Sequence, residues 1–204
     1  MGKFLEFGFN RFFLGMIVTA FFWLFTLAGG VVFGLAPASA TLMSLYAEHG
    51  YTYRAYSLKE AWELYKSNFV KSNLAFYSFV FVDLVLVYGL YLLVQLPHQT
   101  IFHLLATFLN VLVVALVFLA YTVSLKLQVY FDLSYRNTVK LSLIGIFMSL
   151  PAIAKVLIGT GLLVGVGYYM PALLFFVGIG VWHFFISDML EPIYESIHEK
   201  LATK

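Results

Sequence analysis

The sequence predicts an all-α membrane protein, a polytopic bundle of transmembrane helices. Of its 204 residues, 62% are hydrophobic and only 11% are charged, whereas soluble domains carry roughly 45–50% apolar and about 25% charged residues. The mean hydropathy is +0.93, and the apolar residues gather in long tracts between polar segments. These observations exclude a soluble domain with a polar surface.

The tracts after the first predict four membrane crossings. A helix needs about 20 apolar residues to cross roughly 30 Å of hydrocarbon. Two tracts have this length, and the last tract, 141–187, is long enough for two crossings and is interrupted near Gly165 and Pro171. The predicted spans are 74–96, 101–125, 141–164 and 171–187.

The first tract, 12–47, is too long for one crossing, even by a tilted helix. It contains Gly29, Gly30 and Pro37, at which a helix can end or begin. We expect one crossing, then a shorter helix over 37–46 that either returns across the membrane or re-enters it. The predicted fold is therefore five full spans plus one short or re-entrant helix.

The distribution of basic residues predicts the orientation. If the first tract turns back, every Lys and Arg except Lys155 lies on one side of the membrane, which places both termini in the cytoplasm. A secretory signal peptide is the alternative, because basic residues, an apolar run and Ala38-Ser39-Ala40 follow one another. The apolar run is much longer than the usual 7–15 residues, so we prefer the membrane hairpin.

Two polar segments have the pattern of amphipathic helices. Residues 57–73 open with Ser57 and Glu60, a capping-box pair, and present Trp62, Tyr65 and Phe69 at helical spacing. This aromatic face is either an interfacial anchor or a docking surface for a partner. The tail, 188–204, is predicted to be a cytoplasmic amphipathic helix. Its acidic face, either solvated or in contact with a basic partner, consists of Glu191, Glu195 and Glu199.

Polar residues inside the predicted spans are the candidate functional residues, because burying them in hydrocarbon is costly. Asp83 lies in the second span, Asn110 in the third and Lys155 in the fourth. At about 1.5 Å per residue, all three fall deep enough to form one buried polar cluster. Such a cluster could bind a polar solute or relay a proton. Alternatively, an Asp83–Lys155 ion pair could fix helix register, or Lys155 could extend its amine to the interface.

Several classes of chemistry have no support in the sequence. There is no cysteine, and the histidines form no metal-ligand pattern. Catalytic and phosphate-binding motifs are missing, so we expect neither a metal site nor a cofactor nor an enzyme. A net charge of +2 gives no indication of nucleic-acid binding. The Gly30–Gly34 and Gly161–Gly165 pairs predict faces for close helix packing.

The first 75 residues resemble the YesL-like family, small multi-span membrane proteins mostly of Gram-positive bacteria. The residues that carry the resemblance are the Pro-Ala-rich run 37–46, with Thr41 inserted before Leu42, and the segment Asn68-Phe69-Val70-Lys71. The resemblance implies a plasma-membrane location and an association with ABC-type sugar uptake systems. It brings no catalytic or ligand residue.

Taken together, these observations predict a non-enzymatic accessory subunit of a carbohydrate transporter. The lipid bilayer and the permease subunits of an ABC transporter are its expected partners. The alternative is a small autonomous transporter or channel that uses the polar residues in its spans. An intramembrane enzyme that modifies lipids is the third and weakest hypothesis, because no acid, base and nucleophile converge in the sequence.

Overall fold

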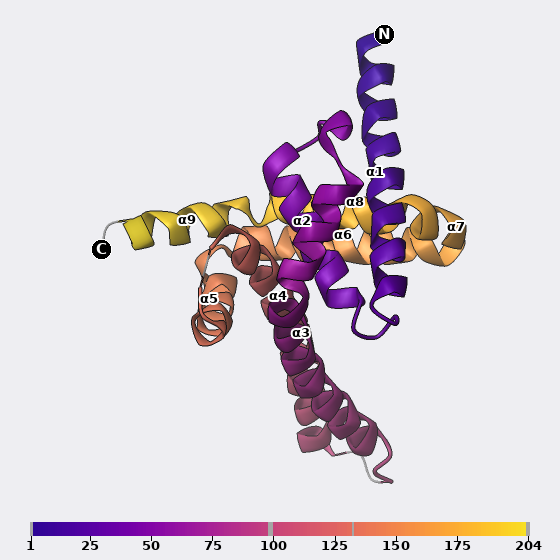
Figure 1. The fold of residues 1–204 in the computed structure, drawn as a ribbon. Coiled ribbons are helices and arrows are strands. Elements are labelled where there is room, and N and C mark those ends of the chain that lie inside the picture. The colour runs from indigo at the N-terminus through magenta and orange to yellow at the C-terminus, as the bar shows by residue number, and fades with distance from the viewer. Residues whose placement is uncertain (1, 98–99, 132, 203–204) are drawn as a thin grey trace.

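The computed structural model describes residues 2–97, 100–131 and 133–202, and all regular structure in these residues is helical (Figure 1). The elements are α1 (Gly2–Ala28), α2 (Leu35–His49), η1 (Tyr53–Ala55), α3 (Leu58–Val94), α4 (Ile101–Tyr130), α5 (Tyr135–Met148), α6 (Leu150–Tyr169), α7 (Pro171–Leu173), the π-helical η2 (Leu174–Gly178), α8 (Ile179–Met189) and α9 (Glu191–Ala202).

Five helical segments among the described residues are long and apolar enough to cross a membrane, which confirms the predicted number of spans. They are Gly8–Ala28, Leu58–Val94, Ile101–Tyr130, Leu150–Tyr169 and Pro171–Met189. The short helix expected after the first span is α2.

The turn between α1 and α2 depends on glycine. Gly30 and Val31 have φ angles of 71° and 65°, a region that a β-branched residue rarely adopts. A Cβ atom on Gly34 would lie 2.3 Å from the Thr26 carbonyl oxygen, and one on Gly29 would lie 2.4 Å from the Tyr65 hydroxyl. The chain therefore reverses within a few residues, and α2 packs directly against α1.

Helix α2 lies at the centre of the molecule. It packs against α1, α3, α4 and α8, and nearly all of its side chains from Ala36 to Tyr46 are buried. One side contributes Leu42 to a core shared with α1 and α3, and the other contributes Met43 to a core shared with α4, α6 and α8. A helix that is apolar on all sides must be enclosed, and here other helices of the chain enclose it.

Three predicted boundaries need correction. The interfacial helix 57–73 and the span 74–96 form one continuous helix, α3, since no Gly or Pro interrupts the chain between them. The predicted span 141–164 divides at Ser149, because Pro151 in the first turn of α6 cannot continue the preceding helix. The span 101–125 continues to Tyr130.

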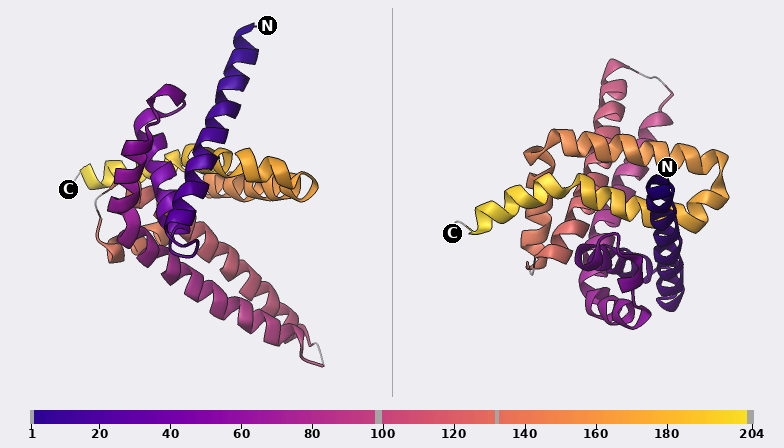
Figure 2. Two further views of the ribbon diagram at one scale, coloured as in Figure 1. Left: turned by 45° about the vertical axis from the view of Figure 1, so that its right-hand side comes forward. Right: turned by 90° about the horizontal axis from the view of Figure 1, so that it is seen from above.

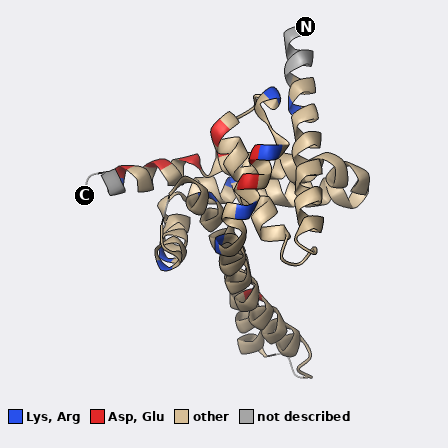
Figure 3. Cartoon of the chain, viewed as in Figure 1, with Lys and Arg blue, Asp and Glu red and all other residues tan. Residues whose placement is uncertain are grey.

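The long helices form two hairpins that diverge. Helices α3 and α4 pack side by side and extend away from the rest of the chain, while α6 and α8 form a second arm that runs in a different direction (Figures 1 and 2). Both hairpin tips lie away from α9 (Figure 2). Charged residues gather at the end that carries α9 and the loops around α2, and the arms hold few (Figure 3).

Candidate functional site

The α3–α4 hairpin holds two of the three predicted polar residues. One oxygen of Asp83 and the amide oxygen of Asn110 are both inaccessible to solvent and have no hydrogen-bond partner. The Asn110 amide nitrogen lies 3.4 Å from the position of a Cβ on Gly89. Gly89 is six residues from Asp83 in α3, so the two polar side chains are offset by about 9 Å along the helix. They share the interior of the hairpin without bonding to each other.

Lys155 does not join them. Because α6 begins only at Leu150, Lys155 lies in its second turn and is exposed. No ion pair joins it to Asp83 among the residues that the structure describes. The prediction placed Lys155 too deep in its span, because it overlooked the break at Pro151.

The predicted aromatic face of α3 is mostly internal. Tyr65 is buried and stacks on Phe25 of α1 and on Trp62, with centroid distances of 5.1 and 5.4 Å. Phe69 packs against the same core, and only Trp62 is substantially exposed. This face therefore attaches α3 to α1 and α2 instead of presenting a free docking surface.

Ser57 is the residue before α3, as predicted, but its side chain makes no capping hydrogen bond. Glu60, the expected partner, instead lies 2.7 Å from Nε2 of His49. Glu48 completes this group, and the ligand atoms of the three side chains lie within 4.8 Å of one another. No local pattern predicted a partner for His49, because the loop between α2 and α3 brings these residues together. The bond between His49 Nε2 and Glu60 joins the end of α2 to the start of α3.

Among the residues that the structure describes, Lys126 is the charged side chain that is buried, and it lies just after the predicted span 101–125. Its Nζ donates to the Ser187 carbonyl and to Glu191 Oε2, both at 2.5 Å. It also lies 5.0 Å from the centre of the Tyr130 ring. The amine thereby neutralises the C-terminal end of α8 and fixes α9 to α4. The acidic face predicted for the tail thus has one member, Glu191, in an internal ion pair.

A second polar contact joins α8 to the loop after α2. Asp188 accepts hydrogen bonds from the hydroxyls of Tyr46 at 2.5 Å and Tyr51 at 2.9 Å. Burial and the bond to Asp188 raise the pKa of Tyr46. Burial is also the main cause of the raised pKa of Tyr51. The Arg11 guanidinium lies 3.9 Å from the centre of the Tyr51 ring. These contacts hold the polar ends of α1, α2 and α8 together.

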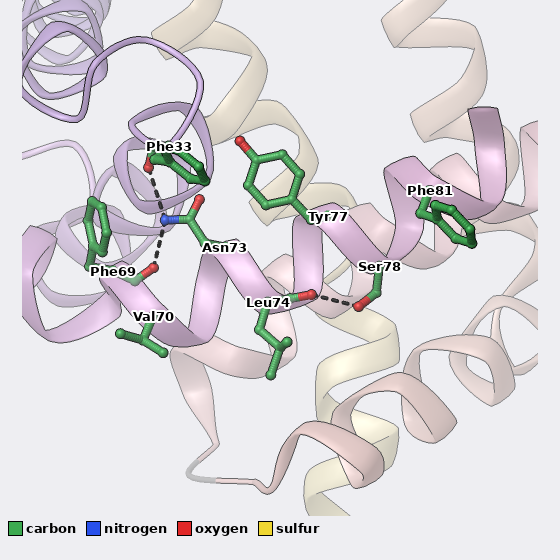
Figure 4. A pocket seen from close by; sticks show the side chains of 8 residues that line it. All are labelled: Phe33, Phe69, Val70, Asn73, Leu74, Tyr77, Ser78 and Phe81. Atoms are coloured by element: carbon green, nitrogen blue, oxygen red, sulfur yellow. Dashed lines mark hydrogen bonds between the residues drawn. The ribbon is translucent and has the colours of Figure 1, made fainter.

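An open groove lies between the α1–α2 turn and α3 (Figure 4). Its volume is about 630 Å³, and its walls are mostly apolar and exposed. The Asn73 amide donates to the Phe33 carbonyl at 3.0 Å and to the Phe69 carbonyl at 2.9 Å. Figure 4 shows Asn73 directed toward Phe33 rather than into open space. Asn73 therefore anchors the glycine turn on α3.

The strongest candidate site is a cavity of about 550 Å³ where the two arms diverge. Seven elements line it: α1 with Trp23, α2 with Ser39, α4 with Phe118, α6 with Thr160, α7 with Pro171, η2 with Phe175, and α8 with His183. Aromatic rings make up much of its wall, and a volume in the range of about 300–1,000 Å³ is typical of small-molecule sites. We refer to it as the His183 cavity.

His183 is the buried polar group of this cavity. Only 1% of its surface is exposed, Nδ1 lies 2.7 Å from the Ile179 carbonyl, and Nε2 has no hydrogen-bond partner. A carbonyl oxygen can only accept, so Nδ1 carries a proton, whereas Nε2 is inaccessible to solvent. The sequence pattern predicted only that the histidines form no metal-ligand set, and it did not single out His183. The available signal was a histidine four residues after Ile179 inside an uninterrupted apolar run.

Neither predicted glycine pair forms a packing face within the chain. Gly161 and Gly165 have no atom within 4 Å of a Cβ position, and the same holds for Gly30, although Gly34 is in close contact with α1. The glycines of α6 that pack tightly are Gly159, where a Cβ would lie 2.1 Å from the Phe185 ring, and Gly167, where it would lie 2.9 Å from the Leu174 side chain. The sequence spacing identified the helix but not the packed position.

Comparison with known proteins adds a family without a known activity. No curated protein and no solved structure matches the chain. The profile of one family matches residues 16–90, and its description is "Protein of unknown function, DUF624". The match covers the second half of α1, all of α2 and nearly all of α3, and it is consistent with the resemblance to the YesL-like family. The chain is thus a multi-pass helical membrane protein whose residues 16–90 are similar to the DUF624 family.

Proposed function

We propose that the chain is a non-enzymatic accessory subunit of an ABC-type carbohydrate uptake system in the plasma membrane of a Gram-positive bacterium. The observation that carries this proposal is the α3–α4 arm, which has little internal packing. Only 6% of the most apolar stretch of α3 and 11% of that of α4 are buried, against 39% for α1. This arm offers a long apolar surface inside the membrane on which the helices of a permease can pack.

The open glycines of α6 support the same proposal. Small residues let transmembrane helices approach closely, which is the main source of packing energy between helices in lipid. Gly161 and Gly165 are one helical turn apart and have free space above them. A partner helix can therefore use this face, and the carbohydrate connection comes from the resemblance to the YesL-like family.

The proposal is tested by cross-linking in the native membrane. A photoreactive amino acid replaces Leu162, which is 66% exposed beside the open glycines, and mass spectrometry identifies the adducts. We expect an adduct with an ABC permease that disappears when Gly161 and Gly165 are both replaced by Ile. Adducts with lipid alone, together with recovery of the protein by itself in mild detergent, would reject the accessory role.

A small autonomous transporter or channel is the second candidate, and the α3–α4 hairpin is the observation in its favour. Asp83 and Asn110 each hold an acceptor oxygen without a partner inside an apolar hairpin, and such groups often line ion or proton pathways. Purified protein in liposomes should then carry a solute or proton flux that falls with Asp83→Asn and is unchanged by Lys155→Gln. Equal flux for wild type and Asp83→Asn would remove this candidate.

A further inference from the structure

We propose that Glu48, His49 and Glu60 form a binding site for Zn²⁺ at the place where α2 ends and α3 begins. Each side chain offers one ligand atom, a nitrogen of the imidazole or an oxygen of a carboxylate, and these three atoms lie within 4.8 Å of one another. The sequence analysis expected no metal site, because Glu60 is 11 residues from His49 and no local spacing connects them. This inference does not depend on the proposed accessory function.

The distances between the three donors suit a single ion. Nε2 of His49 lies 2.7 Å from Glu60 Oε1 and 4.0 Å from Glu48 Oε2. With ligand bonds of about 2.0–2.2 Å, the donors around a tetrahedral zinc ion lie roughly 3.4 Å apart. The two distances lie on either side of this separation, so small movements of the side chains are enough to place all three donors around one ion.

The chemistry of the donors selects the kind of ion. Zn²⁺ binds imidazole nitrogen and carboxylate oxygen, whereas Mg²⁺ and Ca²⁺ prefer oxygen ligands alone. Two ionised carboxylates balance the charge of a divalent ion, and the neutral imidazole adds no charge. Three protein donors leave a fourth position for water or for a further ligand, as in zinc sites that are not purely structural.

The electrostatic surroundings favour a cation at this place. Within the described part of the chain, neither Glu48 nor Glu60 forms an ion pair with a Lys or Arg. Two neighbouring carboxylates repel each other unless a proton or a cation lies between them. The C-terminal end of α2, which carries His49, adds the negative end of a helix dipole. A simple bridge between His49 and Glu60 would not need Glu48 beside it, whereas a divalent ion uses all three side chains.

The loop after α2 shapes the site and leaves it accessible to water. The Gly50 N–H donates to the Tyr46 carbonyl at 2.9 Å, and the Tyr56 hydroxyl donates to the Gly50 carbonyl at 2.7 Å. The side chain of His49 is 23% exposed and that of Glu60 is 31% exposed, so an ion can enter from solvent. The site lies among the loops around α2, where charged residues gather (Figure 3).

Isothermal titration calorimetry tests the site directly. The full chain is purified in detergent without a polyhistidine tag, treated with EDTA, dialysed, and titrated with Zn²⁺ and separately with Ca²⁺. We expect a single saturable Zn²⁺ site, with Ca²⁺ binding at least about tenfold weaker because Ca²⁺ gains little from an imidazole ligand. Absence of Zn²⁺ binding, or equal affinity for Ca²⁺, would overturn the proposal, since the carboxylates would then be an ordinary solvated pair.

Variants identify the ligands. Glu48→Gln, His49→Gln and Glu60→Gln should each weaken Zn²⁺ binding by at least about 10- to 100-fold, the loss that follows even from removing a partner of a metal ligand. Glu48→Gln keeps the test valid if the other two variants fail to fold, because the Glu48 side chain is 57% exposed. Zn²⁺ should raise the melting temperature of the parent protein but not that of Glu48→Gln. Glu63→Gln and His198→Gln, at exposed positions, should bind Zn²⁺ like the parent. Binding that Glu48→Gln leaves unchanged would overturn the proposed ligand set.

Discussion

The Lys126 amine connects α4 to both α8 and α9. Breaking a buried ion pair costs about 3–5 kcal/mol, and Glu191 is 44% exposed and can be rehydrated. We therefore expect Lys126→Met to lower the free energy of unfolding by about 2–4 kcal/mol, measured by titration with denaturant in mixed micelles. Lys140→Met, at an exposed position, is the matched control and should change it by less than about 0.5 kcal/mol. An equal effect of the two variants would contradict the role of Lys126.

Glu48 makes the stability of the fold depend on pH. Its pKa is raised by a hydrogen bond with Glu60 and then by burial, while His49 acts in the opposite direction. The folded state therefore holds this proton more tightly than the unfolded state, and stability falls as the pH rises from the ordinary carboxyl range through the raised pKa. Because Glu48 is largely exposed, we expect an effect below about 1 kcal/mol.

Replacing Glu48 by Gln should remove this part of the pH dependence, since the amide stays neutral. The melting temperature in detergent, measured across mildly acidic to neutral pH, should fall less steeply for Glu48→Gln than for wild type. Glu63→Gln, an exposed neighbour on α3, should retain the wild-type profile. A steeper fall in Glu48→Gln would show that the carboxylate form is the one that stabilises the fold.

At the scale of elements, α6 has one packed and one open glycine face. Gly159 meets the Phe185 ring of α8, whereas Gly161 faces open space only two residues away. A methyl group added to a packed interface costs about 1–3 kcal/mol, so Gly159→Ala should destabilise the fold by that amount. Gly161→Ala should be neutral or slightly stabilising, because alanine favours helix. Unfolding of both variants side by side checks this, and equal losses would mean that the two faces are packed alike.

Local sequence patterns were sufficient to predict some of the helices and their boundaries, but not all of them. Apolar tract length predicted five spans, and glycine with Pro37 predicted the short helix α2, because both depend on local chain properties. Pro151 also indicates the helix boundary at Ser149, although the predicted span ran through it. The continuity of α3 could not be predicted in this way, because amphipathic and apolar segments can share one helix without any local signal.

At the scale of the whole molecule, the arrangement of the arms predicts a topology. Both hairpin tips lie away from the charged end (Figures 2 and 3), so we expect the tips outside the cell and the charged end, with both termini, in the cytoplasm. Since the protein has no cysteine, single cysteines can report this. Gln95→Cys and Tyr169→Cys should react with an impermeant maleimide in intact cells, and Thr52→Cys and Lys140→Cys only after permeabilisation.

One labelling outcome would contradict this topology. Reaction of Thr52→Cys and Tyr169→Cys from the same side would place α2 and the tip of the α6–α8 arm in one compartment, which contradicts the hairpin topology. Phe25→Cys, at a fully buried position, should remain unlabelled under both conditions and controls for unfolding.

By itself, the sequence determined that this protein is helical, lies in a membrane and has five spans, because those properties follow from the length and composition of contiguous segments. Only the tertiary structure decided which polar groups meet. It separated Lys155 from Asp83, buried Lys126 against Glu191, enclosed Tyr65 and joined His183 to a cavity. Those outcomes depend on where helices cross, and crossing positions are set by packing between residues far apart in the chain.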